Sequence, residues 1–237
     1  MDASTLLTLW ERGVSQPDVD RGDGLLQALD VDASVPRTLG ERTVRLLDLH
    51  ARLFGPQADL LSHCPACGAD AQFAVDCAEL ASQIAPADPV QSHHLAIDDF
   101  EITFRLPNSR DVAASANPDE DAFVRRLLER CVVSSTRHGE HVEARVWPES
   151  IVDALSNRIE ALDPGASISF ALSCPACASA WRAPLDCGQL LWQKVQLAAE
   201  RLLLDIDTLA RAYGWTESDV LHLSPIRRAA YVQMTTA

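Results

Sequence analysis

The sequence predicts an α+β protein in which a zinc-ribbon-like pair of β-hairpins is embedded in a mostly helical domain with a long C-terminal helix. Three observations lead to this fold class. A segment built around CPAC occurs twice in the chain. Apolar residues at helical spacing cover most of the remaining sequence, and one apolar stripe of this kind continues over residues 187–212.

The repeated segment is the feature on which the other predictions depend. Residues 60–80 read LLSHCPACGADAQFAVDCAEL, and residues 171–190 read ALSCPACASAWRAPLDCGQL. The two copies align without a gap when Cys64 is placed against Cys174. Each copy contains a CPAC turn, a strand-like stretch, an Asp-Cys pair and a helix-like run. A repeat of this kind indicates one supersecondary unit that is used twice.

The cysteines of the repeat match the ligand set of a closed tetrahedral zinc site. The predicted ligands are Cys64, Cys67, Cys174 and Cys177. A tight turn holds both thiolates of a pair on one side, where backbone N–H groups can point at the sulfur atoms. Residues 68–173 separate the pairs, far more than the about 15–20 residues of a usual ribbon, but loop-closure entropy grows slowly with length. We therefore predict that hairpins at residues 58–77 and 166–187 share one structural Zn²⁺.

The residue after the second cysteine differs between the two copies. Gly68 can adopt a positive φ without steric cost, whereas the same backbone conformation would be unfavourable by roughly 1–2 kcal/mol for Ala178. The second turn is therefore expected to be either strained or shaped differently from the first. His63 directly precedes Cys64, and we expect it to be a polar residue at a strand end rather than a metal ligand.

Two other interpretations of the CPAC pairs stay open. The first is a redox dithiol of the thioredoxin type, and the second is a set of thiols without any ligand. A redox CPxC opens a helix after a strand, whereas each CPAC here lies between two strand-like runs, which favours zinc. Cys77, Cys131 and Cys187 have no C-x2-C partner, and we expect them to be small buried side chains.

Composition narrows the classes of function. The 237 residues carry a formal net charge of −14, which argues against general binding of nucleic acids or anionic membranes because both need a basic field. No apolar run approaches the roughly 18 residues of a membrane span. Seven cysteines, an odd number with four in metal spacing, and an N-terminus without a secretory signal predict a protein of the reducing cytoplasm.

The sequence contains none of the common enzyme signatures that we sought. HExxH, GxSxG, GxxxxGK(S/T) and GxGxxG are all absent. A zinc ion with four cysteine ligands also has no open position at which to activate water. We therefore expect the protein not to be an enzyme.

The chain is predicted to begin with a helical segment and an acidic linker over residues 1–36, followed by a single α+β domain over residues 37–237. Residues 3–13 place their apolar side chains on one side, as in a short helix. Residues 15–24, SQPDVDRGDG, read as the polar linker. The first helix of the domain is expected at residues 40–54, where Gly55-Pro56 ends it.

An α/β insertion is predicted between the hairpins, over residues 78–165. Its expected elements are a strand pair or one long strand at 94–106, a turn at 107–109, a helix from an Asn117 cap to about Cys131, a loop at 134–141, and a helix from Trp147-Pro148 to Asp163-Pro164-Gly165. Alternation of Phe100, Ile102 and Phe104 predicts the strands. Asn117 followed by Pro118 is a typical helix start.

The C-terminal helical module, residues 187–237, is the most strongly patterned part. A helix over 187–212 is expected to end at Gly214 in the left-handed conformation. Thr216-x-x-Asp219 predicts a capping box for a short helix. Ser224-Pro225 starts a last helix that is expected to reach about Met234.

Several motifs occur in a fixed order along the chain. They are CPACG at 64–68, FRLPNSRD at 104–111, W-x4-D-x4-LW from Trp181 to Trp192, RLL at 201–203, LARAYGW at 209–215 and LSPIRRAAY at 223–231. Together they resemble the family of T4-type baseplate hub assembly chaperones, which accompany contractile phage tails and phage-tail-like injection systems. The likeness covers roughly residues 40–235. Ala178, Cys77 and Cys187 depart from the family pattern.

The resemblance implies a non-enzymatic helper in the bacterial cytoplasm that takes part in assembling a baseplate hub or spike. The C-terminal module carries residue types that dominate interface energetics, namely Trp215, Arg227, Arg228 and Tyr231, and we expect them to hold the hub or spike component. Trp215 can also be read as a core residue at a helix elbow, and the two arginines as solvated side chains. The alternative function is a nucleic-acid- or protein-binding zinc-ribbon adaptor of the transcription type.

Overall fold

The computed structural model describes residues 1–29, 38–87 and 92–235. The chain forms two compact units, one of Met1–Leu29 with Gly188–Ala237 and one of Asp30–Cys187. Helices and small antiparallel sheets are both present, so the predicted α+β fold class is confirmed. The predicted boundary between residues 36 and 37 lies outside the described residues, and the division that it makes stays a prediction.

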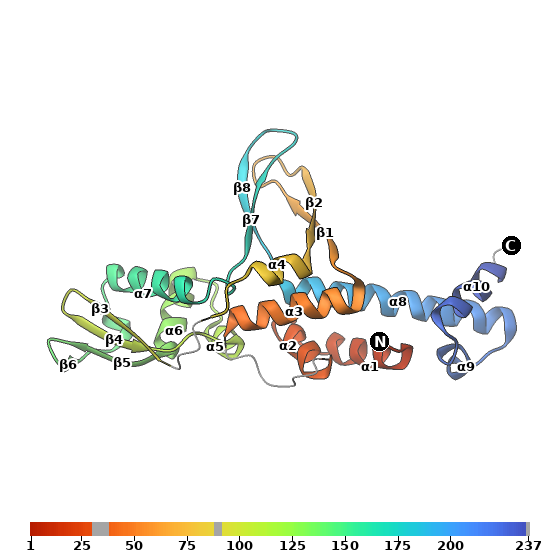
Figure 1. Cartoon of the computed structure of the whole chain (residues 1–237), viewed down its shortest axis with the longest axis horizontal. Coiled ribbons are helices and arrows are strands. Elements are labelled where there is room, and N and C mark those ends of the chain that lie inside the picture. Colours follow the sequence, from red (N-terminus) through yellow and green to blue (C-terminus); the bar gives the residue numbers. More distant parts are fainter. Residues whose placement is uncertain (30–37, 88–91, 236–237) are drawn as a thin grey trace. The chain divides into compact units, whose positions relative to one another are not determined.

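The described residues of the first unit fold into helices (Figure 1). These are α1 (Ala3–Val14), α2 (Asp18–Leu29), α8 (Cys187–Tyr213, of which Cys187 belongs to the second unit), α9 (Glu217–Leu221) and α10 (Pro225–Thr235). The long C-terminal helix is therefore confirmed, and Gly214 ends it with a φ of 66°. No helix in the described parts of the chain is long and apolar enough to cross a membrane.

The first unit has a core that runs along one face of α8. Its buried members are Leu7, Ala199, Leu202, Ile206, Leu209 and Val220. The four members from α8 follow one another at spacings of three and four residues, which is the stripe that the sequence predicted. Gly13 lets α1 approach α8, because a Cβ on this residue would lie 2.1 Å from Cζ3 of Trp192.

The predicted linker at residues 15–24 is wrong, because most of it belongs to α2. Asp18 and Asp20 lie in the first turn, where the helix dipole favours acidic side chains. The guanidinium of Arg21 lies over the Trp192 ring at 5.0 Å. The run of polar residues is thus the outer side of a short amphipathic helix rather than a break between domains.

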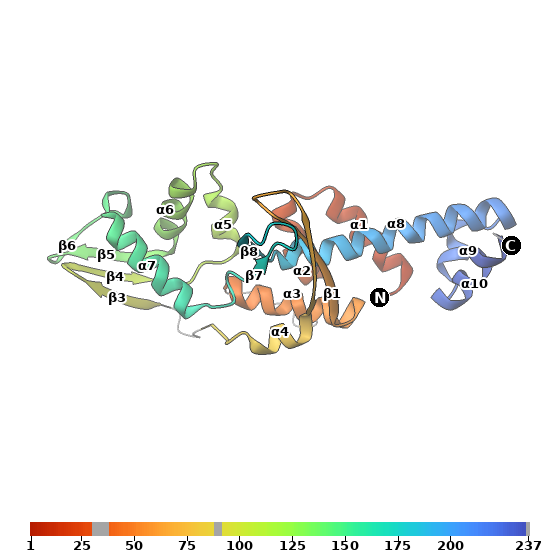
Figure 2. The same ribbon diagram turned by 90° about the horizontal axis from the view of Figure 1, so that it is seen from above.

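The second unit carries all the strands of the described residues (Figure 2). In chain order its elements are α3 (Leu39–Phe54), β1 (Gln57–His63), β2 (Asp70–Asp76), α4 (Cys77–Gln83), β3 (His93–Ile97), β4 (Phe100–Phe104), α5 (Ser109–Ser115), α6 (Glu120–Cys131), β5 (Val132–Arg137), β6 (Glu140–His141), a 3₁₀ turn η1 (Ala144–Val146), α7 (Glu149–Leu162), β7 (Ser169–Ser173) and β8 (Ala180–Pro184). The predicted hairpins at both CPAC segments and the strand pair near residues 94–106 are present.

The insertion between the hairpins forms a four-stranded antiparallel sheet in the order β3-β4-β5-β6. Helices α6 and α7 lie on one face of this sheet (Figure 1). The core between the sheet and these helices contains the alternating residues of β4 and the apolar face of α7. Its buried members include Phe100, Ile102, Phe104, Leu128, Trp147, Ile151, Leu155 and Ile159.

The loop predicted at residues 134–141 is wrong, because these residues belong mainly to β5 and β6. Ser135 of β5 points into the core and is 1% exposed. Its Oγ accepts a hydrogen bond of 3.1 Å from Nε1 of Trp147, so a polar strand residue is satisfied internally. The segment is polar because the other side of β5 faces water, and this composition is why the sequence predicted a loop.

Two helix starts differ from the prediction. Asn108 caps α5 through a capping box with Asp111, whereas only a turn was expected there. Asp119, rather than Asn117, caps α6, and its side chain accepts from the N–H of Ala122. The Asn117 side chain accepts from the N–H of Asp119 and so stabilises the turn before the helix.

Candidate metal centre

The two CPAC turns have the same backbone geometry. In the first turn the N–H of Cys64 donates to the carbonyl of Ala69 at 2.9 Å, and the N–H of Gly68 donates to the carbonyl of Cys64 at 2.9 Å. In the second turn the N–H of Cys174 donates to the carbonyl of Ser179 at 2.9 Å, and the N–H of Ala178 to the carbonyl of Cys174 at 3.0 Å. The turns join the strands of hairpins β1–β2 and β7–β8, which pair in equivalent registers up to the turn.

The open question about Ala178 is therefore resolved in favour of strain. Gly68 has a φ of 74° and Ala178 a φ of 59°, so both residues occupy the left-handed region. A Cβ in this region approaches the following carbonyl oxygen. The second turn keeps the shape of the first in spite of its alanine.

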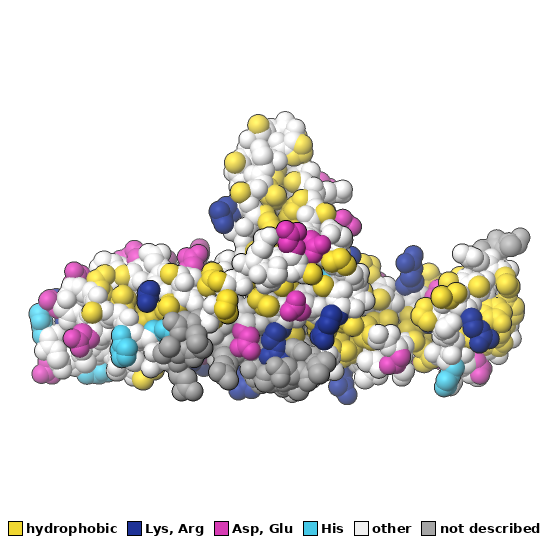
Figure 3. Space-filling view, in the orientation of Figure 1, with side chains coloured by type: hydrophobic (Ala, Val, Ile, Leu, Met, Phe, Trp, Pro, Cys, Tyr) yellow, Lys and Arg dark blue, Asp and Glu magenta, His cyan; other side chains and the backbone are white. Residues whose placement is uncertain are grey.

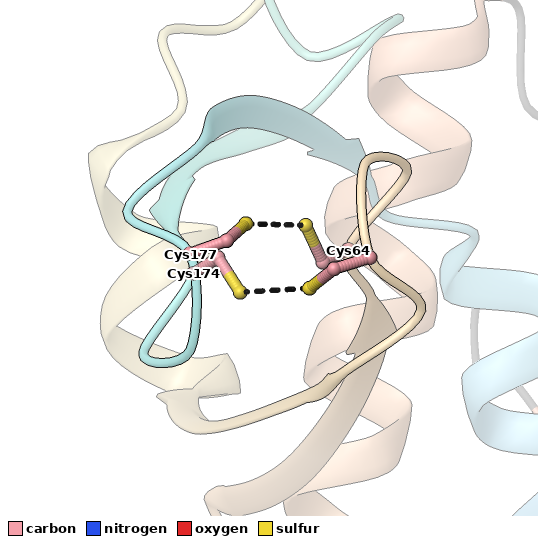
Figure 4. Close-up of side chains that lie close together, drawn as sticks. Cys64, Cys174 and Cys177 are labelled. Atoms are coloured by element: carbon pink, nitrogen blue, oxygen red, sulfur yellow. Dashed lines mark hydrogen bonds between the residues drawn. The ribbon is translucent and has the colours of Figure 1, made fainter.

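The turns bring the four predicted cysteines together (Figure 4). Their sulfur atoms all lie within 4.8 Å of one another. Sγ of Cys64 is 3.7 Å from Sγ of Cys177, and Sγ of Cys67 is 3.6 Å from Sγ of Cys174. These distances are much longer than the S–S bond of about 2.0 Å in a disulfide. A tetrahedron with Zn–S bonds of about 2.3 Å has edges of about 3.8 Å, so the cluster fits such an ion closely.

The electrostatics of the cluster also favour a cation. The N–H groups of Cys177 and Ala176 point at Cys174 and lower the pKa of its thiol to about 6, against the opposing effect of desolvation. The N–H of Ser179 acts to lower the pKa of Cys177, but hydrogen bonds to the thiols of Cys67 and Cys174 outweigh it and raise this pKa to about 12. Once one cysteine of the cluster is ionised, its negative charge disfavours ionisation of the neighbouring thiols, because like charges lie close together. A bound divalent cation removes this opposition.

Aromatic side chains hold the two hairpins against each other below the turns. The rings of Phe73 on β2 and Phe170 on β7 have centroids 5.3 Å apart and are tilted by 60°. Nε1 of Trp181 on β8 donates a hydrogen bond of 3.2 Å to Oγ of Ser62 on β1. These contacts join residues that are 97 positions (Phe73 and Phe170) and 119 positions (Ser62 and Trp181) apart in the chain, and they hold together the hairpins that carry the four sulfur atoms. Sequence reasoning did not identify them, although inward alternation along the strands was their signal.

The remaining cysteines and His63 lie outside the cluster. Cys77, Cys131 and Cys187 are 0%, 1% and 5% exposed, which confirms the prediction that they are buried. Burial raises the pKa of Cys131 and of Cys187 to about 12, so both remain protonated thiols at neutral pH. His63 is exposed and pairs through Nδ1 with Asp70 at 2.7 Å, in keeping with a polar residue at a strand end.

The predicted partner residues lie near one another in the first unit, but in different roles. Trp215 and Tyr231 are half-buried and pack against the core of this unit. Nε of Arg228 forms an ion pair with Asp205 at 3.1 Å, and both side chains are largely buried. Arg227 is exposed. Three of the four are therefore built into the fold, and the role of this group in binding stays a prediction. Asp205 gave no signal in the sequence.

Comparison with protein families finds a match over residues 29–183 to the family described as T4 bacteriophage base plate protein. The matched segment covers more than half of the chain and contains both CPAC turns. The C-terminal motifs RLL, LARAYGW and LSPIRRAAY lie beyond it, so the resemblance that they carry stays a prediction. Searches of curated proteins and of solved structures find no match.

Proposed function

This chain belongs to the family of T4 bacteriophage base plate proteins, and from that premise we propose that it is a non-enzymatic assembly factor for the hub or spike of a contractile, phage-tail-like baseplate. Its four-cysteine cluster binds a structural Zn²⁺ in this proposal. Membership of the family implies contacts with other baseplate proteins. The order of motifs along the chain supports the more specific role at the hub.

The observation that carries the zinc assignment is the convergence of the four sulfur atoms from two distant hairpins. Four cysteine thiolates at the corners of a tetrahedron are a typical ligand set of a structural Zn²⁺ site. Four protein ligands fill the coordination sphere, so the ion has no position for a substrate or a reactive water. A site of this kind stabilises a fold rather than catalysing a reaction.

The zinc site also has a structural purpose in the proposed function. Cys64 and Cys67 lie before the inserted sheet, whereas Cys174 and Cys177 lie after it. One ion would therefore close the whole segment from β1 to β8 and fix the base from which the insertion extends. Rigid presentation of a surface lowers the entropy cost of binding a partner.

Deletion of the gene in a producing strain tests the assembly role. We expect electron microscopy of the deletion strain to find tails or particles without complete baseplates, and purified wild-type particles to lack this protein or contain it in low amount. Complementation with the wild-type gene should restore complete particles. Complementation with Cys131→Ala, which changes a buried cysteine outside the cluster, should do the same. Normal particles in the deletion strain would remove the assembly function.

A further inference from the structure

The outer side of α10 carries a stripe of apolar residues. Ile226 is 84% exposed and Met234 is 64% exposed, and Ala230 lies between them at a spacing of four residues from each. Residues at this spacing lie on one side of a helix. Hydrophobic side chains gather over α8 and α10 in the space-filling view (Figure 3). We call Ile226, Ala230 and Met234 the α10 stripe.

The opposite side of α10 fixes the helix to the rest of its unit. Arg228 pairs with Asp205 on α8 at 3.1 Å. The Tyr231 ring meets Trp215 edge-on at a centroid distance of 4.9 Å, and Trp215 stacks on Tyr213 at 4.9 Å. Val232 packs against the same core. These contacts hold a short helix in one orientation, and the α10 stripe is thereby presented in a preorganised form.

The charge of α10 is opposite in sign to the charge of the whole chain. The helix contains two arginines and no acidic residue, whereas the chain has a formal net charge of −14. Asp205 offsets the charge of Arg228. Arg227 lies at the edge of the α10 stripe, is exposed, and has no side-chain partner among the described residues. A carboxylate at the rim of a groove that received the stripe would therefore complement the charge of Arg227.

From these features we infer that the α10 stripe inserts into an apolar groove, bordered by at least one carboxylate near Arg227, on another protein of the baseplate. This inference rests on the proposed function, because that function supplies the class of partner. An amphipathic helix commonly binds a partner by laying its apolar face into a hydrophobic groove. A second copy of this chain fits less well, because two bodies of the same large negative charge repel each other.

The test measures binding of the purified chain to purified hub and spike proteins from the same gene cluster, one at a time. Ile226→Glu and Met234→Glu place a charge in the stripe and should weaken binding at least about tenfold. Val19→Glu is the matched control, since Val19 is 59% exposed on α2 of the same unit, and its affinity should stay within about twofold of wild type. Arg227→Glu should weaken binding and reduce its dependence on salt. Circular dichroism and thermal unfolding of each variant establish that it is folded.

Each other outcome overturns a stated part of the inference. Wild-type affinity in both stripe variants would remove the stripe as the contact and leave the assembly function intact. A wild-type chain that binds none of the hub and spike proteins would remove the assembly function as well. A wild-type dimer in sedimentation velocity that Ile226→Glu converts to a monomer would assign the stripe to self-association and overturn the proposed partner.

Discussion

The backbone N–H of Gly40 donates a hydrogen bond of 2.9 Å to Oδ2 of Asp163, a residue 123 positions further along the chain. Gly40 lies in the first turn of α3, and Asp163 is the C-terminal cap of α7. Asp163 is 1% exposed, and burial raises the pKa of its carboxyl group. Because α3 leads into β1 and Asp163 shortly precedes β7, this contact joins the two segments from which the hairpins start.

Gly40→Ala should destabilise the second unit. A Cβ at this position would lie 1.9 Å from Oδ1 of Asp163 and 3.2 Å from Cα of Gly165, so the start of α3 must move away from Asp163. We expect a loss of about 1–3 kcal/mol in the free energy of unfolding, measured by urea denaturation. Gly24→Ala is the control, because its Cβ would meet only the side-chain end of Gln16. Equal stability of Gly40→Ala and wild type would show that the contact between Gly40 and Asp163 is not closely packed.

The purified protein should contain one zinc per chain. Mass spectrometry of metals should find it in the wild type, and the zinc should be absent or strongly reduced in Cys64→Ser and in Cys174→Ser, because each variant removes one of four ligands. Cys131→Ala should retain it. Two zinc ions per chain would contradict a shared site, as would unchanged zinc in both serine variants.

Removal of the zinc should lower the melting temperature. The ion would tie together hairpins whose cysteines are 107 and 113 residues apart in the chain, and structural zinc contributes directly to folding. A loss of about 3 kcal/mol corresponds to a shift of about 6–12 °C for a protein of this size. Scanning calorimetry with and without a strong chelator measures the shift. Cys64→Ser should not respond to chelator, and an unchanged melting curve for metal-free wild type would show that the site is incidental.

The two turns offer a matched pair of backbone substitutions. Ala178 adopts a φ of 59°, so Ala178→Gly should stabilise the zinc-bound protein by about 0.5–1 kcal/mol, after allowance for the greater freedom of glycine in the unfolded chain. Gly68→Ala should have the opposite effect. No atom lies within 4 Å of a Cβ built at Gly68, so the change there is conformational rather than steric. Denaturant unfolding of both variants checks the signs, and a destabilised Ala178→Gly would contradict the account.

The cysteine cluster could be predicted from the sequence because its signal is local and duplicated. Each CPAC turn shows its two thiols within four residues, and the gapless alignment indicates that the turns are equivalent. The end of α8 and the start of α9 could be predicted for the same reason, since Gly214 and the Thr216–Asp219 capping box act within one turn of the helix. Local chemistry of this kind does not depend on the rest of the fold.

Pairings across long sequence distances could not be predicted. The bond from Trp181 to Ser62 spans 119 residues, and that between Arg228 and Asp205 spans 23 residues across a turn and a short helix. Each member is an ordinary residue in its own segment. The sequence therefore leaves Arg228 available for a partner, whereas the fold pairs it internally with Asp205. Strand β5 was not predicted because its inward residue, Ser135, is polar. Its hydroxyl accepts a hydrogen bond from Trp147, which only the folded chain brings near.

Asp111 should make stability depend on pH in the acid range. Its carboxylate receives two hydrogen bonds from Arg105, at 2.6 and 2.8 Å, and its side chain is 4% exposed. Burial acts to raise the pKa of Asp111, but Arg105, the N–H of Asn108 and Arg130 outweigh it and hold the pKa below the usual 3.8. The unfolded chain therefore binds the proton first, so this stabilisation is present at neutral pH and is lost as the pH falls below about 3.8.

Asp111→Asn should then reduce the free energy of unfolding at pH 7 by about 1–3 kcal/mol, a range set below that of a fully buried pair because Arg105 remains partly in water. The difference from wild type should shrink as the pH falls from 5 towards 2. Urea denaturation across this range measures both curves. Asp207→Asn, which breaks an exposed pair with Arg211 on α8, should leave stability unchanged at every pH. A constant difference between Asp111→Asn and wild type over the whole range would show that the effect is steric rather than electrostatic.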